Sequence, residues 1–445
     1  MQETVVLVGA GSAVFTRGLV ADIIRLGWET DLRLVDISPE ALSVAEGLTG
    51  KMIEAKSAPI RLSASTELRD MLPGASVVIT TIAVGGRSAW EDDVLIPRKY
   101  GIYQPVGDSV MPGGTSRSLR MIPAMVDIAK AVVELAADAL FFNYSNPMAT
   151  ICRAVRKATG ATMVGLCHGV PGVARYLASA LGVASDDIAY TAVGMNHLTW
   201  FTELRVQGQD AMPRLHEIAR EKLKGRATDA ADAEDNPFSW HLFELFGAFP
   251  AVLDRHVSEF FTQFFADGQY YGKTLGVDAF SFEATIERGN EIFEEMRQDA
   301  LSDQPLRDDY FEQFSGEHEQ VTEMIESIRQ DAGRIYSANL PNRGQVPNLP
   351  EDAIVECPAI ADGSGLRPII QPPLPAAVVG TLATRMACVE TVVEAALEGS
   401  REKLIQALVL DGAVDSLETA TRLADELLAA QAKHLPQFET MPKPT

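Results

Sequence analysis

Two patterns of apolar and polar residues alternate along the first half of the chain. Short β-branched or continuous apolar runs, typical of strands, alternate with stretches that repeat apolar residues every three or four positions, typical of helices. The predicted strands span residues 4–8, 32–36, 60–64, 75–82, 139–143 and 162–166. The predicted helices span residues 14–26, 41–55, 118–136 and 149–157. This alternation predicts an α/β fold with a Rossmann-like, doubly wound parallel sheet.

The pattern of apolar and polar residues changes near residue 190. A strand at 188–193 is followed by a segment at 198–206 that alternates as a half-exposed antiparallel strand does, and residues 353–357 also resemble a strand. Helices are predicted at 217–235, 287–298, 317–329, 376–398, 401–410 and 414–432, and residues 238–265 are rich in aromatic side chains. At 445 residues the chain is long enough for two domains. We predict a Rossmann-like dinucleotide-binding domain at 1–190 and an α+β catalytic domain at 191–445.

The amino-acid composition limits the classes of partner that the protein can bind. The chain is 47% hydrophobic and 22% charged, as soluble globular proteins are, and its formal net charge is −23. Because a surface this acidic repels phosphate groups, nucleic acid and anionic membranes are disfavoured as binding partners. No window approaches eighteen uninterrupted apolar residues, no signal peptide is visible, and the four cysteines are scattered. We expect a cytoplasmic protein. Apolar stripes on the last helices suggest the subunit contacts of a homodimer or homotetramer, although helices that only close the core have the same pattern.

The first strand ends in Gly9-Ala10-Gly11-Ser12 and a helix follows, an arrangement that places backbone N–H groups against a pyrophosphate. Val14 stands where the usual fingerprint has a third glycine. The second strand ends at Asp36, about twenty-five residues after Gly11, where a carboxylate accepts hydrogen bonds from ribose hydroxyls and repels a 2′-phosphate. We therefore predict NAD, bound at Gly9, Gly11, Ser12 and Asp36, rather than NADP.

Further polar residues follow the apolar strands. Arg87 comes shortly after the strand at 75–82, where it can contact substrate or form a surface salt bridge. The stretch 107–115 is a predicted glycine-rich loop whose one carboxylate is Asp108. Asn143 and Asn146, in Asn143-Tyr144-Ser145-Asn146-Pro147, can position nicotinamide or sugar hydroxyls, although an Asn-Pro turn needs no function.

Sulfur and imidazole side chains come at the ends of two other strands. Gly165-Leu166-Cys167-His168-Gly169-Val170 follows one strand, and Gly194-Met195-Asn196-His197 follows the next. Cys167 and His197 are residue types that bind divalent transition metals. His168, beside Cys167, is a third residue of a type that binds such metals. A single histidine is more often a satisfied core residue, but the pairing of His197 with Cys167 favours a metal site.

Together these blocks resemble the NAD- and manganese-dependent glycoside hydrolases of family four, and the resemblance covers essentially the whole chain. It also rests on Val84-Gly85-Gly86, on Pro112-Gly113-Gly114 and on residues 339–356. It implies a fold like that of lactate and malate dehydrogenases. It further implies that NAD oxidises C3 of the sugar, that a base removes the proton from C2, and that the aglycone leaves by elimination while Mn²⁺ stabilises the enediolate.

The resemblance also implies roles for single residues. Cys167 and His197 match the metal ligands, Asp108 a carboxylate that serves as acid or base towards water, and Asn146 a sugar-binding asparagine. His168 is assigned to substrate contact or protonation of the leaving group, and Asn196 to substrate binding. Many relatives have a tyrosine as the C2 base, but residues 238–265 contain none. Asp254 is our first choice for that base and His256 the second.

The Cys-His-Gly-Val form of the metal motif resembles enzymes of unphosphorylated α-glycosides, namely α-galactosides, α-glucosides and α-uronides, with a slight lean towards uronides. The rival within catalysis is an NAD-dependent dehydrogenase of 2-hydroxy acids or sugars, which accumulates NADH. A second rival is an inactive NAD-sensing protein that binds NAD without metal-dependent turnover.

Overall fold

The computed structural model describes residues 1–224, 235–307, 309–314 and 319–438. One sheet runs through the whole molecule, in the order β10-β8-β7-β14-β13-β6-β5-β4-β1-β2-β3, with β9 and β15 paired to β8 and β14. Its first-half strands are β1 (Gln2–Val8), β2 (Glu29–Val35), β3 (Ile60–Ser65), β4 (Val77–Thr80), β5 (Leu140–Asn143) and β6 (Val164–Gly165). All of these six pair in parallel, in the order expected of a doubly wound fold, so the predicted fold class is confirmed.

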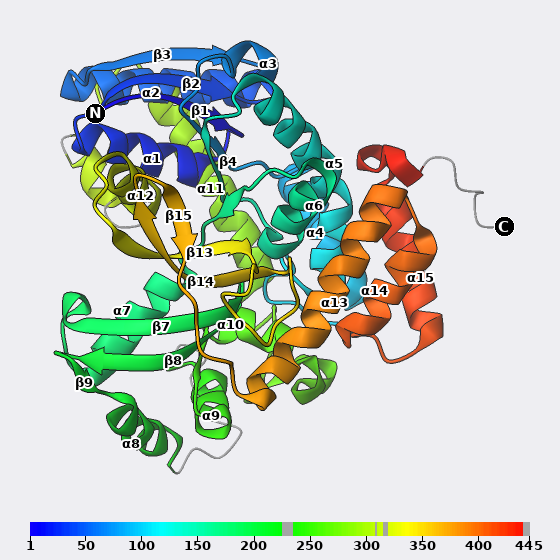
Figure 1. Ribbon diagram of the computed structural model, residues 1–445. Coiled ribbons are helices and arrows are strands. Elements are labelled where there is room, and N and C mark those ends of the chain that lie inside the picture. The colour runs from blue at the N-terminus through cyan, green and yellow to red at the C-terminus, as the bar shows by residue number, and fades with distance from the viewer. Residues whose placement is uncertain (225–234, 308, 315–318, 439–445) are drawn as a thin grey trace.

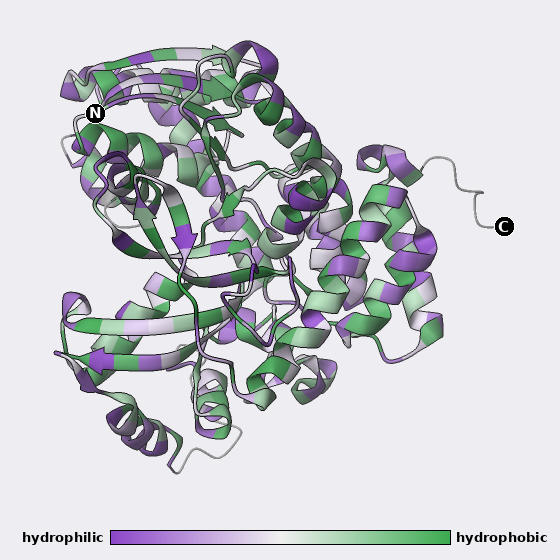
Figure 2. Cartoon of the chain, viewed as in Figure 1, coloured by the Kyte–Doolittle hydropathy of each residue, from purple (hydrophilic) through white to green (hydrophobic). Residues whose placement is uncertain are grey.

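Helices cover both faces of this parallel sheet. The helices of the first half are α1 (Ala13–Arg25), α2 (Pro39–Lys56), α3 (Leu68–Met71), α4 (Gly86–Arg98), α5 (Met111–Leu135), α6 (Met148–Thr159) and α7 (Gly169–Leu181). Of these, α7 packs on the later strands of the sheet and not on the parallel ones. Successive residues of β1 point to opposite faces, because the side-chain period of a strand is two. Val5 and Leu7 join the core that includes α1 and α2, whereas Val6 and Val8 join the core that includes α5 and α6. In Figure 2, green apolar segments alternate with purple and pale ones along the outer strands of the parallel sheet.

The second half extends the same sheet with antiparallel strands. They are β7 (Ile188–Met195), β8 (Leu198–Val206), β9 (Gln209–Asp210), β10 (Phe249–Ala251), β13 (Arg334–Pro341), β14 (Ile354–Asp362) and β15 (Gly365–Pro368), with β11 (Gln269–Tyr270) and β12 (Lys273–Thr274) apart as a hairpin. The two halves join where β13 pairs antiparallel with β6, at Asn339 and Gly165. The sheet is continuous there, and the predicted domain boundary near residue 190 stays a prediction.

The helices of the second half complete the core. They are α8 (Met212–Leu223), α9 (Pro237–Phe246), α10 (Asp254–Val257), α11 (Phe282–Leu301), α12 (Glu319–Arg329), α13 (Ala376–Glu398), α14 (Arg401–Asp411) and α15 (Leu417–Ala430). Helix α11 packs on α1 and α2, and α12 on α1, so part of the second half covers the first (Figure 1). Of the predicted helix at 217–235, residues 225–234 lie outside the described residues.

One prediction from glycine was wrong, and one helix was not predicted. The stretch 107–115 is a loop only as far as Val110, and α5 begins at Met111, because Gly113 and Gly114 let the first turn approach the preceding loop. A Cβ on Gly114 would lie 2.3 Å from the Ser109 carbonyl carbon. Helix α7 was not predicted, since Gly169, Pro171 and Gly172 are poor helix formers, but a first turn tolerates them.

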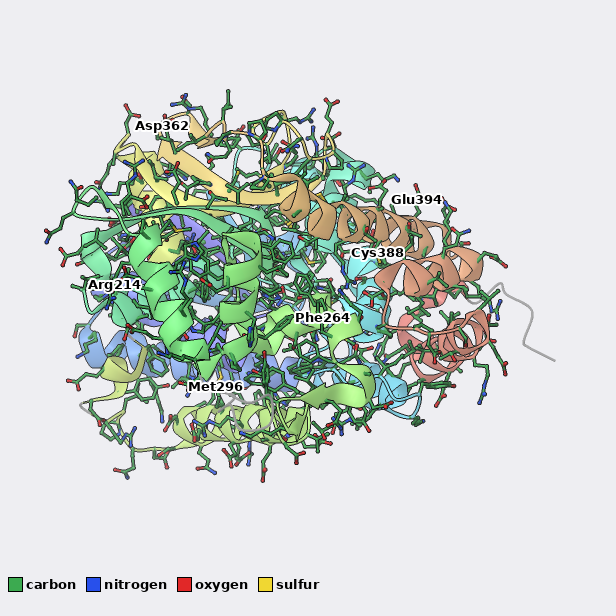
Figure 3. The ribbon with its side chains drawn as sticks, turned by 90° about the horizontal axis from the view of Figure 1, so that it is seen from below. Arg214, Phe264, Met296, Asp362, Cys388 and Glu394 are labelled. Carbon is green, nitrogen blue, oxygen red and sulfur yellow. The ribbon has the colours of Figure 1, made fainter. Side chains whose placement is uncertain are left out.

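Helix α13 qualifies by length and composition alone as a possible membrane span, and within the described ranges it is the one helix that does. It packs against α5, α6 and α14. Its Arg385 forms a buried ion pair with Asp411 on α14 at 2.7 Å. These contacts are those of the core helix of a globular protein. Acidic side chains such as Glu394 lie towards the periphery of this helical layer (Figure 3).

A buried ion pair anchors the loop that carries Asp108. The Arg120 guanidinium on α5 contacts both oxygens of Asp93 on α4, and both side chains are fully buried. The Asp93 backbone carbonyl accepts a hydrogen bond from Gln104, whose Oε1 accepts one from the Gly113 N–H. The Gln104 side chain thereby ties both ends of the 104–113 segment to the stretch of α4 that the ion pair joins to α5.

We expect Asp93→Ala to lower the free energy of unfolding by about 3–5 kcal/mol, because it leaves the Arg120 charge buried without its partner. Chemical denaturation followed by circular dichroism measures this loss. Glu217→Ala, which breaks the exposed Arg214–Glu217 pair on α8, is the matched control and should change stability little. Equal effects of the two substitutions would contradict the assignment.

Candidate active site

The glycine turn after β1 has the geometry of a phosphate-binding turn. A Cβ on Gly9 would lie 2.8 Å from the Ile82 nitrogen, and one on Gly11 would lie 2.6 Å from the Ala41 Cβ, so both positions require glycine. The Gly11 N–H donates to Asp36 Oδ2 at 2.8 Å, which fixes the carboxylate beside the turn. Ser12 is the N-cap of α1, and no side-chain hydrogen bond caps the described helix end. The first N–H groups of α1 are therefore available to an anion.

The two asparagines after β5 have different surroundings. Asn143 is fully buried, and its side chain bonds the Thr80 hydroxyl and both the N–H and the carbonyl of Ser145, so it shapes the turn. Asn146 precedes a cis peptide to Pro147, and its Nδ2 donates to Asp108 Oδ2 at 3.0 Å. The structure therefore places the Asn146 side chain, but not that of Asn143, against the Asp108 carboxylate.

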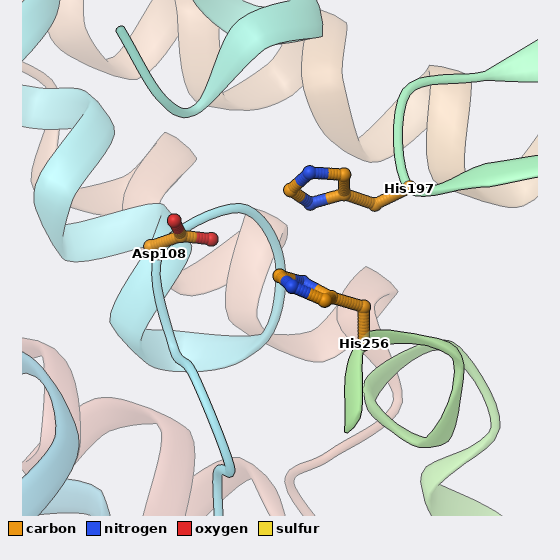
Figure 4. A group of neighbouring side chains, drawn as sticks. All are labelled: Asp108, His197 and His256. Atoms are coloured by element: carbon orange, nitrogen blue, oxygen red, sulfur yellow. The ribbon is translucent and has the colours of Figure 1, made fainter. Parts of the chain in front are cut away.

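Three ligand-type side chains converge beyond Asn146. One potential ligand atom from each of Asp108, His197 and His256 lies within 4.8 Å of the other two, and Figure 4 shows the three side chains facing a common space. The Ser109 hydroxyl bonds Asp108 Oδ1 at 2.8 Å and lies 3.0 Å from His197 Nδ1. His197 stands in the tight turn between β7 and β8 with φ +64°, a conformation that a non-glycine residue seldom adopts.

The electrostatics of this cluster suit a cation. Burial lowers the pKa of His197, and burial together with His197 lowers the pKa of His256 to about 3, so both rings are neutral at neutral pH. Burial opposes the ionisation of Asp108, but His197, His256 and Arg117 hold its pKa below the usual value. Two neutral imidazoles and one carboxylate are a suitable donor set for a divalent ion.

Cys167 lies beside this cluster but is not one of the three. Its Sγ accepts a hydrogen bond from the Gly169 N–H at 3.3 Å. Burial raises its pKa to about 12, and the charges of Glu356 and Asp108 add to that increase. The thiol is therefore protonated unless a bound cation stabilises the thiolate. Its role as a metal ligand stays a prediction.

The other predicted substrate contacts lie apart from one another. His168 stacks on Tyr144 with ring centroids 5.7 Å apart and lines a cavity between α7 and α12. Burial lowers its pKa to about 4. Arg87 donates to Asn290 Oδ1 on α11, and its role in substrate binding stays a prediction. Asn196 is buried 3.5 Å from Glu356 Oε2.

Asp254 has a structural environment. Its two oxygens accept hydrogen bonds from the N–H groups of Phe238 and Ser239, the Ser239 hydroxyl and the Tyr270 hydroxyl, all at 2.5–2.7 Å. The carboxylate thus holds the first turn of α9, and burial raises its pKa. These four donors disfavour the predicted role of Asp254 as a base, whereas His256, our second choice, lies in the cluster.

The sequence matches the profiles of a known enzyme family along both halves of the chain. Residues 4–183 match the profile of the Family 4 glycosyl hydrolases, and residues 192–414 match that of the Family 4 glycosyl hydrolase C-terminal domain. An alpha-glucosidase of Erwinia rhapontici is 32% identical, with 97% of this chain and 98% of that protein covered. The chain belongs to the family 4 glycosyl hydrolases. The predicted resemblance is confirmed, and so is the prediction of a glycosidase.

Other relatives of this family 4 glycosidase extend the comparison. An alpha-galacturonidase of Bacillus subtilis is 30% identical, with 92% of this chain and 93% of that protein covered. A solved 6-phospho-alpha-glucosidase from gut microorganisms, in complex with NAD and Mn²⁺, shares the fold with a TM-score of 0.84 at 20% identity, over 98% of this chain and 99% of that one.

The structure adds two buried carboxylates that sequence reasoning missed. Glu259 Oε1 accepts hydrogen bonds from the N–H groups of Val106 and Gly107 at 2.9 and 2.8 Å, immediately before Asp108. Glu356 on β14 accepts one from the Thr199 hydroxyl at 3.0 Å and lies beside Asn196. Glu259 follows His256 by three residues, which is the one sequence signal that could have drawn attention to it.

Burial raises the pKa of Glu259 to about 8. A raised pKa in the folded state stabilises the fold fully below the unfolded pKa near 4.5, and this contribution is lost as the pH rises to about 8. In Glu259→Gln the amide oxygen can still accept hydrogen bonds from both N–H groups, but the side chain no longer titrates. We expect the stability of the wild type, relative to this variant, to fall between pH 5 and pH 8 in metal-free denaturation. Parallel curves would contradict the assignment.

Proposed function

We propose that this family 4 glycosidase cleaves unphosphorylated α-glycosides with NAD and a divalent metal, Mn²⁺ first, by transient oxidation of the sugar. The observation that carries the proposal is the convergence of Asp108, His197 and His256 beside Asn146, which follows β5 of the sheet that also contains β1 and its glycine turn. Relatives that are named alpha-glucosidase and alpha-galacturonidase support an α-glycoside, and the NAD and Mn²⁺ of a structural neighbour support the cofactors.

The residues fit both cofactors. Gly9, Gly11 and the uncapped start of α1 accommodate a pyrophosphate, and Asp36 accepts hydrogen bonds from ribose hydroxyls. Of the candidate ligands, His197 and Cys167 would hold the metal, which leaves His256 free to act as the base. When bound, NAD would accept and return the C3 hydride, and the metal would polarise the sugar oxygens at C2 and C3.

The chain's own residues then move protons and orient the sugar. His256 is neutral at neutral pH and buried among the cluster, so it can take the C2 proton. Asp108 is ionised and can activate the water that adds at C1. Asn146 and Asn196 orient sugar hydroxyls. His168, whose pKa of about 4 makes it a weak proton carrier at neutral pH, contacts substrate.

The roles of His256 and Asp254 can be separated by exchange of the substrate's C2 proton into deuterated solvent. We expect His256→Gln to reduce exchange at least 100-fold while NAD binding persists. Asp254→Asn should mainly lower thermal stability, because an amide cannot accept all four hydrogen bonds. Mass spectrometry of the recovered sugar measures exchange. Loss of exchange in folded Asp254→Asn, with normal exchange in His256→Gln, would reverse the assignment.

The same reaction separates the proposal from its rivals. With NAD, Mn²⁺ and a reducing agent, we expect release of nitrophenol from a nitrophenyl α-glycoside without net formation of NADH, because the cofactor is regenerated each turnover. Absorbance at the wavelengths of nitrophenol and NADH follows both products. Stoichiometric NADH would indicate a dehydrogenase, and NAD binding without metal-dependent turnover would indicate a sensor.

A further inference from the structure

A single row of paired residues joins the strands that lead to the two proposed metal ligands. Strands β13 and β14 lie between β6 and β7 in the sheet (Figure 1). Gly165 of β6 pairs with Asn339 of β13, and Asn339 pairs with Glu356 of β14. Glu356 in turn pairs with Gly194 of β7. The ligands come two residues after Gly165 and three after Gly194, which places Glu356 between the two strand ends that carry them.

Glu356 is a buried carboxylate that accepts hydrogen bonds from both sides of this row. The Thr199 hydroxyl on β8 donates to its Oε2 at 3.0 Å, and the Ser337 hydroxyl on β13 donates to its Oε1 at 3.5 Å. Thr199 pairs with Gly194, and because this glycine has no side chain, the hydroxyl can reach Glu356 across β7. Donors on the strands at either side therefore hold the carboxylate in one position.

Asn196 connects this carboxylate to the ligand residues. It directly precedes His197, and its Nδ2 donates to Glu356 Oε2 at 3.5 Å. Burial raises the pKa of the Cys167 thiol, the charge of Glu356 adds to that increase, and a hydrogen bond from Asn196 lowers it. Both side chains are thus close enough to the sulfur to act on it. The Asn196 Oδ1 is buried and has no hydrogen-bond partner in the described part of the chain, so it stays available to a sugar hydroxyl.

From this arrangement we infer that Glu356, acting through the amide of Asn196, positions the Cys167 sulfur for the divalent metal. The inference rests on the proposed function, because it concerns the metal site assigned there. Glu356 does not belong to the cluster of potential ligand atoms, so its role is to position a ligand and not to bind the ion. Polar partners of this kind fix the orientation of metal ligands, and their loss typically weakens metal binding about ten- to a hundredfold.

The test measures the Kd of Mn²⁺ by electron paramagnetic resonance, at pH 8, because burial raises the pKa of Glu356 to about 7 and the carboxylate is then ionised. We expect Glu356→Gln to weaken Mn²⁺ binding at least tenfold, since its amide replaces one accepting oxygen with a donor. Asn196→Ala should have an effect of similar size. Glu203→Gln, on the exposed part of β8, is the matched control and should leave the Kd unchanged. NAD binding, measured by calorimetry, should persist in all variants.

Two further measurements separate positioning from a general effect of charge. If Glu356 acts through Asn196, the double variant should bind Mn²⁺ about as weakly as the weaker of the two single variants, whereas independent effects would multiply. Loading the protein with Co²⁺ reports on the sulfur directly, because a bound thiolate gives a charge-transfer absorption. We expect this absorption, for each bound Co²⁺, to decrease in Glu356→Gln and to stay unchanged in Glu203→Gln.

An unchanged Mn²⁺ Kd in folded Glu356→Gln would overturn the inference, as would multiplying effects in the double variant or a wild type that binds no Mn²⁺. If circular dichroism shows that Glu356→Gln does not fold, Thr199→Val replaces it. That variant loses the 3.0 Å hydrogen bond to Glu356 and should weaken Mn²⁺ binding at least threefold, and an unchanged Kd would again overturn the inference. A wild type that binds Mn²⁺ but cleaves no nitrophenyl α-glycoside would refute the proposed function and not the role of Glu356.

Discussion

The site depends on one constraint, the fixed position of the short loop that carries Asp108. Two sets of hydrogen bonds hold that loop. Glu259 accepts hydrogen bonds from the two N–H groups immediately before Asp108, and Gln104 ties the segment to the Asp93 carbonyl of α4 and to the Gly113 N–H of α5, two helices that the Arg120–Asp93 pair joins. The loop backbone stays in this position, because moving it would leave buried N–H groups without hydrogen-bond partners, at a cost in free energy. The carboxylate therefore faces His197 and His256 before any ligand arrives, and preorganised charge is what a cation or a developing negative charge requires.

Local patterns in the sequence predict a large part of the fold. The alternation of apolar runs and helical stripes locates all six parallel strands, and the spacing of Gly11 and Asp36 locates the nucleotide turn, because each signal lies within about thirty residues. The predicted positions of Cys167 and His197 at strand ends also agree with β6 and β7. Helix α7 was missed because its first turn contains residues that disfavour helices elsewhere in proteins.

The parts of the site that escaped prediction depend on partners that are distant in sequence. Glu259 contacts residues about 150 positions earlier, and Glu356 contacts Asn196 across 160 positions. A carboxylate in a sequence does not reveal whether four donors surround it, so Asp254 resembled a base as much as a cap. His256 came second for the same reason, since only the assembled β-sheet places α10 opposite the β7–β8 turn.

The pairing of β6 with β13 also affects how the chain folds. Until residues 334–341 are synthesised and in place, the edge of the parallel sheet at β6 has unpaired N–H and carbonyl groups, which other chains can use as a template. Closing a contact across some 170 residues is slow compared with forming a local helix. The nucleotide-binding half is thus completed late by a strand from the second half of the polypeptide, and nascent chains remain open to aggregation until that strand is in place.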